Sequence, residues 1–163
     1  MAFWTDSKLS PTRQHRFLIQ ADGPNKMKGN WWWAKEVSKP AYNIESEEYI
    51  LGNNKFKYPG VLTWEDIEIS IVDTGQQTDS LYKNLNKMGY LTPDASSKGI
   101  EKQGNGSVKT LSILQVDESG KTVEKWDLMN AFISAVQFGS LNYTSDELVE
   151  IRLTVKYDWA VLS

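Results

Sequence analysis

Few side chains in this sequence are of the kinds that perform acid–base or metal chemistry. The chain has one histidine, His15, and no cysteine, which excludes disulfides, thiolate metal sites and a cysteine nucleophile. A serine hydrolase would need His15 as its base, but His15 lies at the start of an expected strand. The GxSxG turn of many such enzymes is also absent. We therefore interpret His15 as a solvated histidine at a strand end.

Acidic pairs are the second chemical feature. They occur at Glu47–Glu48, at Glu65–Asp66, and at Glu147 with Glu150. A glycosidase holds two carboxyl groups about 5–10 Å apart across a cleft. These pairs fall on polar strand faces instead, and no pattern marks a cleft. We expect no enzyme, no catalytic residue, no metal site and no cofactor.

A phosphate site is the third possibility. The segment Gly75–Thr78, GQQT, leads into an expected helix, and a helix N-terminus attracts anions. The segment lacks the glycine spacing and the lysine of a phosphate loop. We interpret it as an ordinary entry into a helix.

Aromatic residues are the unusual part of the composition. Seven Trp, seven Tyr and five Phe occur among 163 residues, more than one small core usually absorbs. Trp31, Trp32 and Trp33 are consecutive in an expected strand, so Trp32 must point away from the other two. We predict that this run contacts another subunit. A Trp-rich carbohydrate-binding module remains an alternative.

The charge balance and hydropathy limit the class of partner. The net charge is −3, from 18 basic and 21 acidic residues, which argues against a surface that holds nucleic acid. No apolar run approaches the ~20 residues of a membrane span, and the N-terminus lacks the apolar core of a secretory signal. We expect synthesis in a cytoplasm and no membrane binding by the chain itself.

The elements that position these residues are mostly strands. Alternating apolar residues predict strands, which we place at Arg16–Ala21, Trp31–Val37, Glu65–Asp73, Val108–Val116, Thr122–Leu128 and Leu148–Trp159. The period changes over Thr78–Tyr90, which predicts one helix. The segment Thr92–Gly106 is rich in Gly and Ser and is expected to be a loop.

Two segments are expected to project from this core. Residues 1–14 form a polar arm with two isolated aromatic anchors, Phe3 and Trp4. Residues 38–62 contain a GNN turn between two strands, which predicts a projecting hairpin. The hairpin would expose aromatic side chains, namely Tyr49, Phe56 and Tyr58.

The sequence thus predicts a mainly β fold in one domain, residues 1–163. We expect an antiparallel β-sandwich or barrel with one flanking α-helix. The strand Glu65–Asp73 shows the pattern most clearly, because its isoleucines face one way and its polar residues face the other. The polar face carries Asp66, Glu68 and Ser70.

Several segments in order resemble the tail tube proteins of contractile-tailed bacteriophages. One is YPGVLTW (Tyr58–Trp64), followed by EDIEISIVD and DSLYKNLNKMGYL. Another is the block Val123–Ala160, with a W-x-L strand end, an AF-x-x-x-V stretch, a G-x-L-x-Y-x-S turn and a closing YDW. The order of elements fits nearly the whole chain, and the C-terminal half fits best.

The resemblance implies a structural virion protein. Members form hexameric rings that stack into an inner tube, and the strands of each ring pool into a barrel of about 24 strands. Partners implied by the resemblance are further copies of the chain, a tail sheath protein outside, a baseplate or tube initiator, a tail terminator, and a tape measure protein and DNA in the lumen. The location would be the virion tail, after assembly in the host cytoplasm.

The resemblance also suggests roles for individual residues. Carboxylates in a lumen repel DNA, so Asp66, Glu68 and Ser70 are the candidates for lining it. The closing strand is a complication, because its polar face mixes both signs of charge: either those charges pair across strands or that face is not the lumen. Contacts between subunits or rings are expected from the arm, the Trp run and the hairpin. The tube of a related contractile injection or secretion system is the alternative with the same fold.

Overall fold

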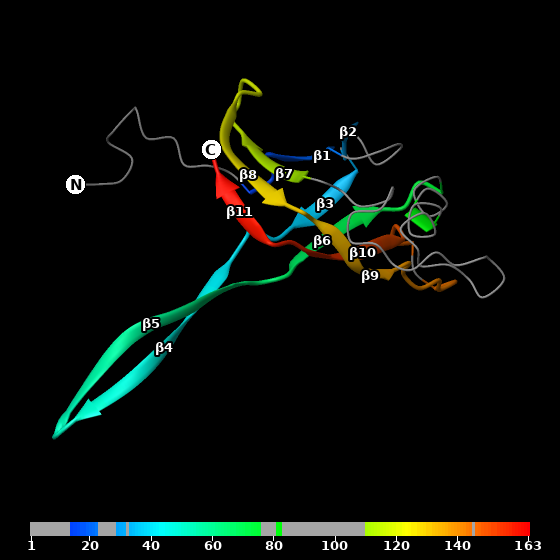
Figure 1. Ribbon diagram of the computed structural model, residues 1–163. Coiled ribbons are helices and arrows are strands. Elements are labelled where there is room, and N and C mark those ends of the chain that lie inside the picture. Colours follow the sequence, from blue (N-terminus) through cyan, green and yellow to red (C-terminus); the bar gives the residue numbers. More distant parts are fainter. Residues whose placement is uncertain (1–13, 23–28, 32, 76–80, 83–109, 145) are drawn as a thin grey trace, which may run out of the picture.

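The computed structural model describes residues 14–22, 29–31, 33–75, 81–82, 110–144 and 146–163. These residues form two antiparallel sheets and one long hairpin (Figure 1). The prediction of a mainly antiparallel β-sandwich is confirmed. The flanking helix predicted at 78–90 lies outside the described residues except for Leu81 and Tyr82, which have helical backbone conformation.

The first sheet has five strands in the order β11-β8-β7-β1-β2. Its members are β1 (Phe17–Asp22), β2 (Gly29–Asn30), β7 (Thr110–Val116), β8 (Thr122–Met129) and β11 (Trp159–Leu162). Strands β7 and β8 form the predicted hairpin around Asp117–Lys121, in which the Asp117 carboxylate accepts a backbone hydrogen bond from Ser119.

The second sheet has four strands in the order β3-β6-β10-β9. Its members are β3 (Ala34–Val37), β6 (Ile67–Val72), β9 (Phe132–Gln137) and β10 (Glu150–Lys156). The register pairs Ile69 with Leu153 and Ile71 with Ile151. Apolar residues of neighbouring strands therefore lie on the same face of this sheet.

One apolar core joins the two sheets. Strands β6 and β10 bury every second residue, as Ile67, Ile69 and Ile71 of β6 show with at most 2% exposure. Strand β10 contributes its own alternate residues and the five-stranded sheet contributes the opposing ones; examples are Ile19, Ile113, Leu128, Ile151 and Leu153. Leu81 belongs to the same buried cluster.

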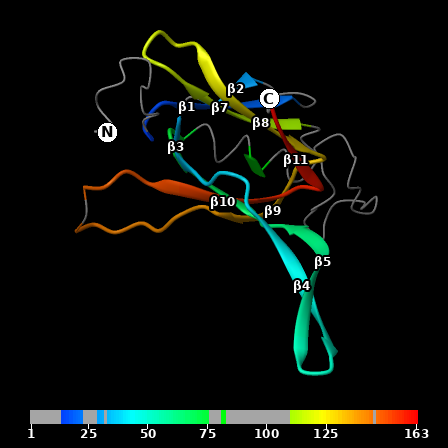
Figure 2. The same ribbon diagram turned by 90° about the vertical axis from the view of Figure 1, so that its left-hand side faces the viewer.

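The hairpin consists of β4 (Tyr42–Leu51) and β5 (Asn54–Trp64). Figures 1 and 2 show that it leaves the two sheets and extends well beyond them. Every residue of β4 is exposed, and so is every residue of β5 except Trp64. The segment predicted as a projecting hairpin, 38–62, therefore corresponds to a two-stranded arm that continues to Trp64.

Three strand predictions need correction. The alternation over Leu148–Trp159 covers two strands, because the chain leaves the four-stranded sheet after Lys156 and enters the five-stranded sheet as β11. The backbone N–H of Asp158 bonds the Met129 carbonyl at this crossing. Trp31–Val37 is a strand only from Ala34 onward. Strand β9 was not predicted, since its exposed Ser134 and Ala135 break the alternation.

Candidate assembly surfaces

The polar face of the four-stranded sheet carries the residues predicted to line a lumen. Asp66, Glu68 and Ser70 alternate with the buried isoleucines of β6, so they lie on the side of the sheet away from the core. Asp66 and Glu68 are exposed, and Ser70 is half-buried. In the register Ser70 lies opposite Arg152, and Glu68 lies opposite Thr154.

Charges on this face pair across strands. Lys156 of β10 lies 3.6 Å from a carboxylate oxygen of Asp66. Glu150 accepts a hydrogen bond from the Ser70 hydroxyl at 3.3 Å and forms an ion pair with Lys35 of β3. The hydrogen bond from Lys35 lowers the pKa of Glu150, and the same contact raises the pKa of Lys35. Of the charges on the closing strand, Glu150 and Lys156 therefore pair across strands, whereas Arg152 forms no ion pair among the described residues.

The same contacts show that the predicted lumen face is not purely acidic. The sequence prediction rests on the carboxylates of β6, which would repel DNA. In the structure Lys35, Arg152 and Lys156 lie beside them, so the face carries both signs of charge. Lys35 and Lys156 each lie within ion-pair distance of a carboxylate, which reduces the charge that they offer to a phosphate backbone.

Among the described residues, neither edge of the four-stranded sheet has a further strand beside it. In the described part of the chain, β3 pairs only with β6, and β9 pairs only with β10. Unpaired N–H and C=O groups along an edge strand form a template for another strand. The sheet is therefore able to continue into neighbouring copies on either side.

The distal half of the β4–β5 hairpin has two unlike faces. Tyr49 pairs with Phe56, and Glu47 pairs with Tyr58, so these four side chains share one face. The three aromatic residues are 44–58% exposed. Lys55 and Lys57 project from the opposite face, where both lie within 3.7 Å of the Glu48 carboxylate. No other described segment of the chain covers this aromatic face.

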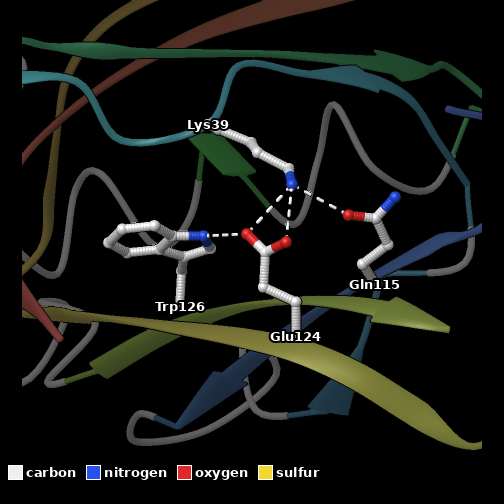
Figure 3. A network of polar contacts seen from close by, with 4 residues as sticks. All are labelled: Lys39, Gln115, Glu124 and Trp126. Atoms are coloured by element: carbon white, nitrogen blue, oxygen red, sulfur yellow. Dashed lines mark hydrogen bonds and ion pairs between the residues drawn. The ribbon is translucent and has the colours of Figure 1, made fainter. Parts of the chain in front are cut away.

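The root of the hairpin is held by two groups of contacts. Trp64 packs between Tyr42 and Tyr157, with ring centroids 5.3 and 5.9 Å away. Lys39, just before β4, donates to both oxygens of Glu124 at 2.9 Å and to Gln115 at 2.8 Å (Figure 3). The Trp126 indole N–H completes the network by donating to Glu124. The hydrogen bond from Lys39 lowers the pKa of Glu124.

The predicted contact residues outside the hairpin lie in different environments. Trp31 is 6% exposed and belongs to the core, so it has little surface left for a neighbour. Trp33 is partly buried against the same core. Phe3, Trp4 and Trp32 lie outside the described residues. Trp31 and Trp33 thus contribute to core packing, and contact of the tryptophan run with another subunit stays a prediction.

Sequence reasoning missed an exposed apolar group on the connection between β9 and β10. Its members are Phe138, Leu141, Tyr143 and Leu148. They line an open groove of about 1380 Å³ together with the first residues of β10. The G-x-L-x-Y signal in this segment was visible in the sequence, but no partner strand or charge pattern marked it as a surface.

Of the candidate acidic pairs, Glu147 and Glu150 both line the groove beside the β9–β10 connection. Glu47 and Glu48 point to opposite faces of the hairpin, as neighbours in a strand do. Among the described residues, no three His, Asp or Glu side chains gather in a metal-binding arrangement. In the same part of the chain, no helix has the length and apolar character needed to cross a bilayer.

Several solved structures share the fold of this chain. No curated protein matches the chain. Among solved structures, the anti-feeding prophage cap (AFP tube terminating cap) is similar with a TM-score of 0.72 and 20% identity, covering 100% of this chain and 99% of that chain. A second similar structure is the PVC sheath-tube complex of an extracellular contractile injection system in its extended state. It has a TM-score of 0.70 and 21% identity, and the match covers 94% of this chain and 91% of that chain.

A third structure extends the same likeness. The six-fold symmetrised anti-feeding prophage (AFP) baseplate gives a TM-score of 0.70 and 14% identity, covering 95% of this chain and 97% of that chain. Likenesses at these identities show the shared fold. The family model described as T4-like virus tail tube protein gp19 matches residues 13–159, nearly the whole sequence. The chain therefore belongs to the T4-like virus tail tube protein family, a family of structural tube proteins of contractile tails.

Proposed function

We propose that the chain forms hexameric rings that stack into the inner tube of a contractile phage tail, through which DNA passes on ejection. The observation that carries the proposal is the four-stranded sheet with one polar face and two open edges. Family membership supports the tube, and a structural relative from a six-fold symmetrised baseplate supports the ring.

Ring closure follows from pairing β3 of one copy with β9 of the next. Six copies would then join their four-stranded sheets into a barrel of about 24 strands. With strands ~4.8 Å apart and tilted by ~40°, the backbone diameter is about 48 Å. Side chains would leave a lumen of about 35–40 Å, which admits a DNA duplex roughly 20 Å wide. Closure would also cover the edges that otherwise invite aggregation.

The face toward the lumen is the polar face with Asp66, Glu68 and Ser70. The opposite face of this sheet is buried in the core, so only the polar face is available to line a barrel built from these strands. Paired charges on it reduce the number of cations free to hold phosphates. DNA would then slide past without stable binding.

The remaining surfaces would meet the other parts of the tail. The hairpin aromatics Tyr49, Phe56 and Tyr58, and the arm with Phe3 and Trp4, would contact neighbouring copies. A sheath protein would cover the outside of the tube, and a baseplate or initiator and a terminator would occupy its ends. The tape measure protein and DNA would occupy the lumen in turn. The assembled protein would reside in the virion tail, after assembly in the host cytoplasm.

Site-specific crosslinking tests the ring directly, because the chain contains no cysteine. Glu36 on β3 and Ala135 on β9 are exposed and lie on the same face as Ser70 and Thr154, respectively. A Glu36→Cys/Ala135→Cys double variant, treated with a short bismaleimide, is expected to give a ladder that ends at a closed hexamer. Each single variant is the control and should give no ladder, since a β3–β9 seam never joins two copies of the same site.

Two results would contradict this ring. A double variant that gives no product beyond the monomer would exclude the β3–β9 seam. A single variant that crosslinks as well as the double variant would show a two-fold contact in place of a ring.

A second candidate is the tube of a related contractile injection machine. The solved relatives from the anti-feeding prophage and the extracellular injection system favour it, since both have this fold. The assembled tube would be the same, and its cargo would differ.

A further inference from the structure

The two edge strands of the four-stranded sheet each contain a β-bulge, which is one extra residue without a partner on the neighbouring strand. On β3 the register with β6 shifts between Ala34 and Glu36, so Lys35 is the extra residue. On β9 the register with β10 shifts in the same way, and the extra residue is Ser134. The interior pairing of the sheet, β6 with β10, has no shift. The irregularities of this sheet therefore lie in the strands that form its edges.

Both extra residues are held by side-chain contacts with β10. The Ser134 hydroxyl donates a hydrogen bond to the Thr154 carbonyl oxygen at 3.2 Å, beside the point where the register shifts. Lys35 reaches across β6 and forms an ion pair with Glu150. Because Lys35 and Ser134 are both exposed, burial does not hold them in place. These contacts make each bulge a defined feature of its edge strand.

A bulge changes what an edge strand offers to a new strand. In a regular antiparallel strand, successive residues direct their N–H and C=O groups to alternate sides, so every second residue can pair with a strand beside the edge. An extra residue interrupts this alternation and increases the local twist. A regular partner strand therefore cannot pair continuously past the bulge. Bulges and lysines are two of the devices by which natural sheets prevent edge-to-edge association, and β3 has both at Lys35.

Strand length indicates why β9 needs a bulge. Among the edge strands of the two sheets, β9 has 6 residues, whereas β3 and β11 have 4 each and β2 has 2. A longer edge offers more hydrogen bonds to another chain, and short edge strands are themselves protected by their length. The bulge at Ser134 divides β9 into two short segments, Phe132–Ile133 and Ala135–Gln137.

We propose that the bulges at Lys35 and Ser134 protect both edges of the four-stranded sheet and keep unassembled copies of the chain from pairing edge to edge. The proposal rests on the ring proposed above in one respect, because the protected edges are those that would join in the ring. The bulges raise the concentration at which such seams form, and they do not abolish the seams. A different role for a bulge is to add curvature to a sheet that closes into a barrel, and the experiments separate the two roles.

Single-residue deletions test the protection in the full-length chain. Deleting Lys35 or Ser134 removes the extra residue and leaves the other pairs of the register in place, so both variants are expected to fold. The concentration at which copies associate, measured by sedimentation velocity, is expected to fall about tenfold or more in each variant. The double deletion makes both edges regular, and it is expected to form species larger than dimers. Far-UV circular dichroism and thermal unfolding check the fold of each variant.

Substitutions at the same two positions are the matched controls. Lys35→Gln and Ser134→Ala keep the extra residue, and therefore the bulge, but remove the charge or the hydroxyl group. Both are expected to associate within about threefold of the concentration at which the original chain does. If Lys35→Gln associates as readily as the Lys35 deletion, the charge of Lys35 and not the bulge protects that edge, and the proposal is overturned there.

The original chain offers a measurement that needs no deletion. With protected edges it is expected to sediment as a monomer at about 10 μM. Oligomers at that concentration, if the Glu36→Cys/Ala135→Cys crosslink shows them to be joined by β3 and β9, would overturn the proposal. Folded deletion variants that associate no more readily than the original chain would do the same. If those variants instead form rings of a different size, seen end-on by electron microscopy, the bulges set the curvature of the barrel.

The edge protection and the tube function fail in different ways. If closed hexamers form but the deletions do not lower the concentration for association, the bulges do not protect the edges and the tube function stands. If the deletions lower that concentration but edge crosslinking finds no closed hexamer, the edge protection stands and the hexameric tube is wrong.

Discussion

Lys39 and Glu124 form an ion pair with an N–O distance of 2.9 Å (Figure 3). Lys39 lies on the connection that carries the chain from β3 to the hairpin, whereas Glu124 is on β8 of the five-stranded sheet. The hairpin leaves from the four-stranded sheet, yet this contact ties its root to the other sheet. The orientation of the arm is therefore fixed by both layers before any partner is present.

Replacing Lys39 by Met tests this connection. Loss of the ion pair leaves the Glu124 carboxylate with only the Trp126 and solvent contacts, and we expect a loss of about 1 kcal/mol in the free energy of unfolding at pH 7. Urea denaturation measures it. Lys121→Met, at an exposed turn, is the control and should cost less than about 0.5 kcal/mol.

The pH dependence of the same variant gives a second test. The pKa of Glu124 is below its ordinary value because of Lys39, so its contribution is present above pH ~4.5 and is lost as pH falls further. Lys39→Met should therefore narrow the stability difference between pH 7 and pH 3. An unchanged acid-unfolding profile would show that Lys39 does not hold the hairpin root.

Replacing Tyr157 by Phe should leave the protein as stable or make it more stable. The Tyr157 hydroxyl is buried and has no hydrogen-bond partner among the described residues, and burial raises its pKa to about 12, with smaller contributions from Asp66 and Glu65. Removing an unpaired hydroxyl is expected to add up to about 1 kcal/mol at pH 7. Tyr42→Phe, at a residue that is 55% exposed, is the matched control with no change expected.

High pH offers an independent check on Tyr157. Because the pKa is raised in the folded state, the stability it contributes is complete below pH ~10 and is lost as pH rises toward 12. The Phe variant should lose less stability over that interval. A destabilised Phe variant would mean that the hydroxyl has a hydrogen-bond partner after all.

Gly139 and Gly120 separate the cost of a backbone angle from the cost of crowding. Both have a positive φ, 84° and 80°, but a Cβ at Gly120 meets open space while one at Gly139 meets the Glu150 carbonyl oxygen. Gly120→Ala is expected to cost about 1 kcal/mol, and Gly139→Ala about 2–3 kcal/mol. Thermal unfolding compares them. Equal losses of stability in the two variants would show that the Glu150 carbonyl oxygen adds no crowding cost at position 139.

A lysine at position 68 tests which face lines the lumen. Glu68 is exposed on the polar face, so Glu68→Lys is expected to leave ring and tube assembly intact. In assembled tails the six added lysines per ring would hold phosphates and slow DNA delivery. Delivery is measured as the rate of genome ejection. Normal delivery from normal tubes would show that another face lines the lumen.

The strands that alternate strictly could be predicted from the sequence. Ile67, Ile69 and Ile71 alternate with Asp66, Glu68 and Ser70, and the structure buries the first set and exposes or half-buries the second. The hairpin was marked by its GNN turn, and Gly52 in that turn has a positive φ of 61°. In both cases a local pattern determines the structure.

The features that could not be predicted depend on which strands lie side by side in the folded chain. Apolar and polar residues alternate from Glu150 to Trp159. This alternation predicts which side chains share a face, but it does not predict that β11 joins the other sheet. Trp31 looked like an interface residue because three tryptophans are adjacent, whereas tertiary packing buries it in the core. The pairing of Lys35 with Glu150 joins residues 115 positions apart, and no local pattern predicts such a contact.

The most direct test of the hexameric tube is negative-stain electron microscopy of the concentrated protein, with averages viewed end-on. We predict six-fold rings or tubes with an open lumen about 35–40 Å wide. The same measurement is repeated with purified baseplates added, since tube growth often needs a template. Monomers that form no ring or tube even on baseplates would contradict the account.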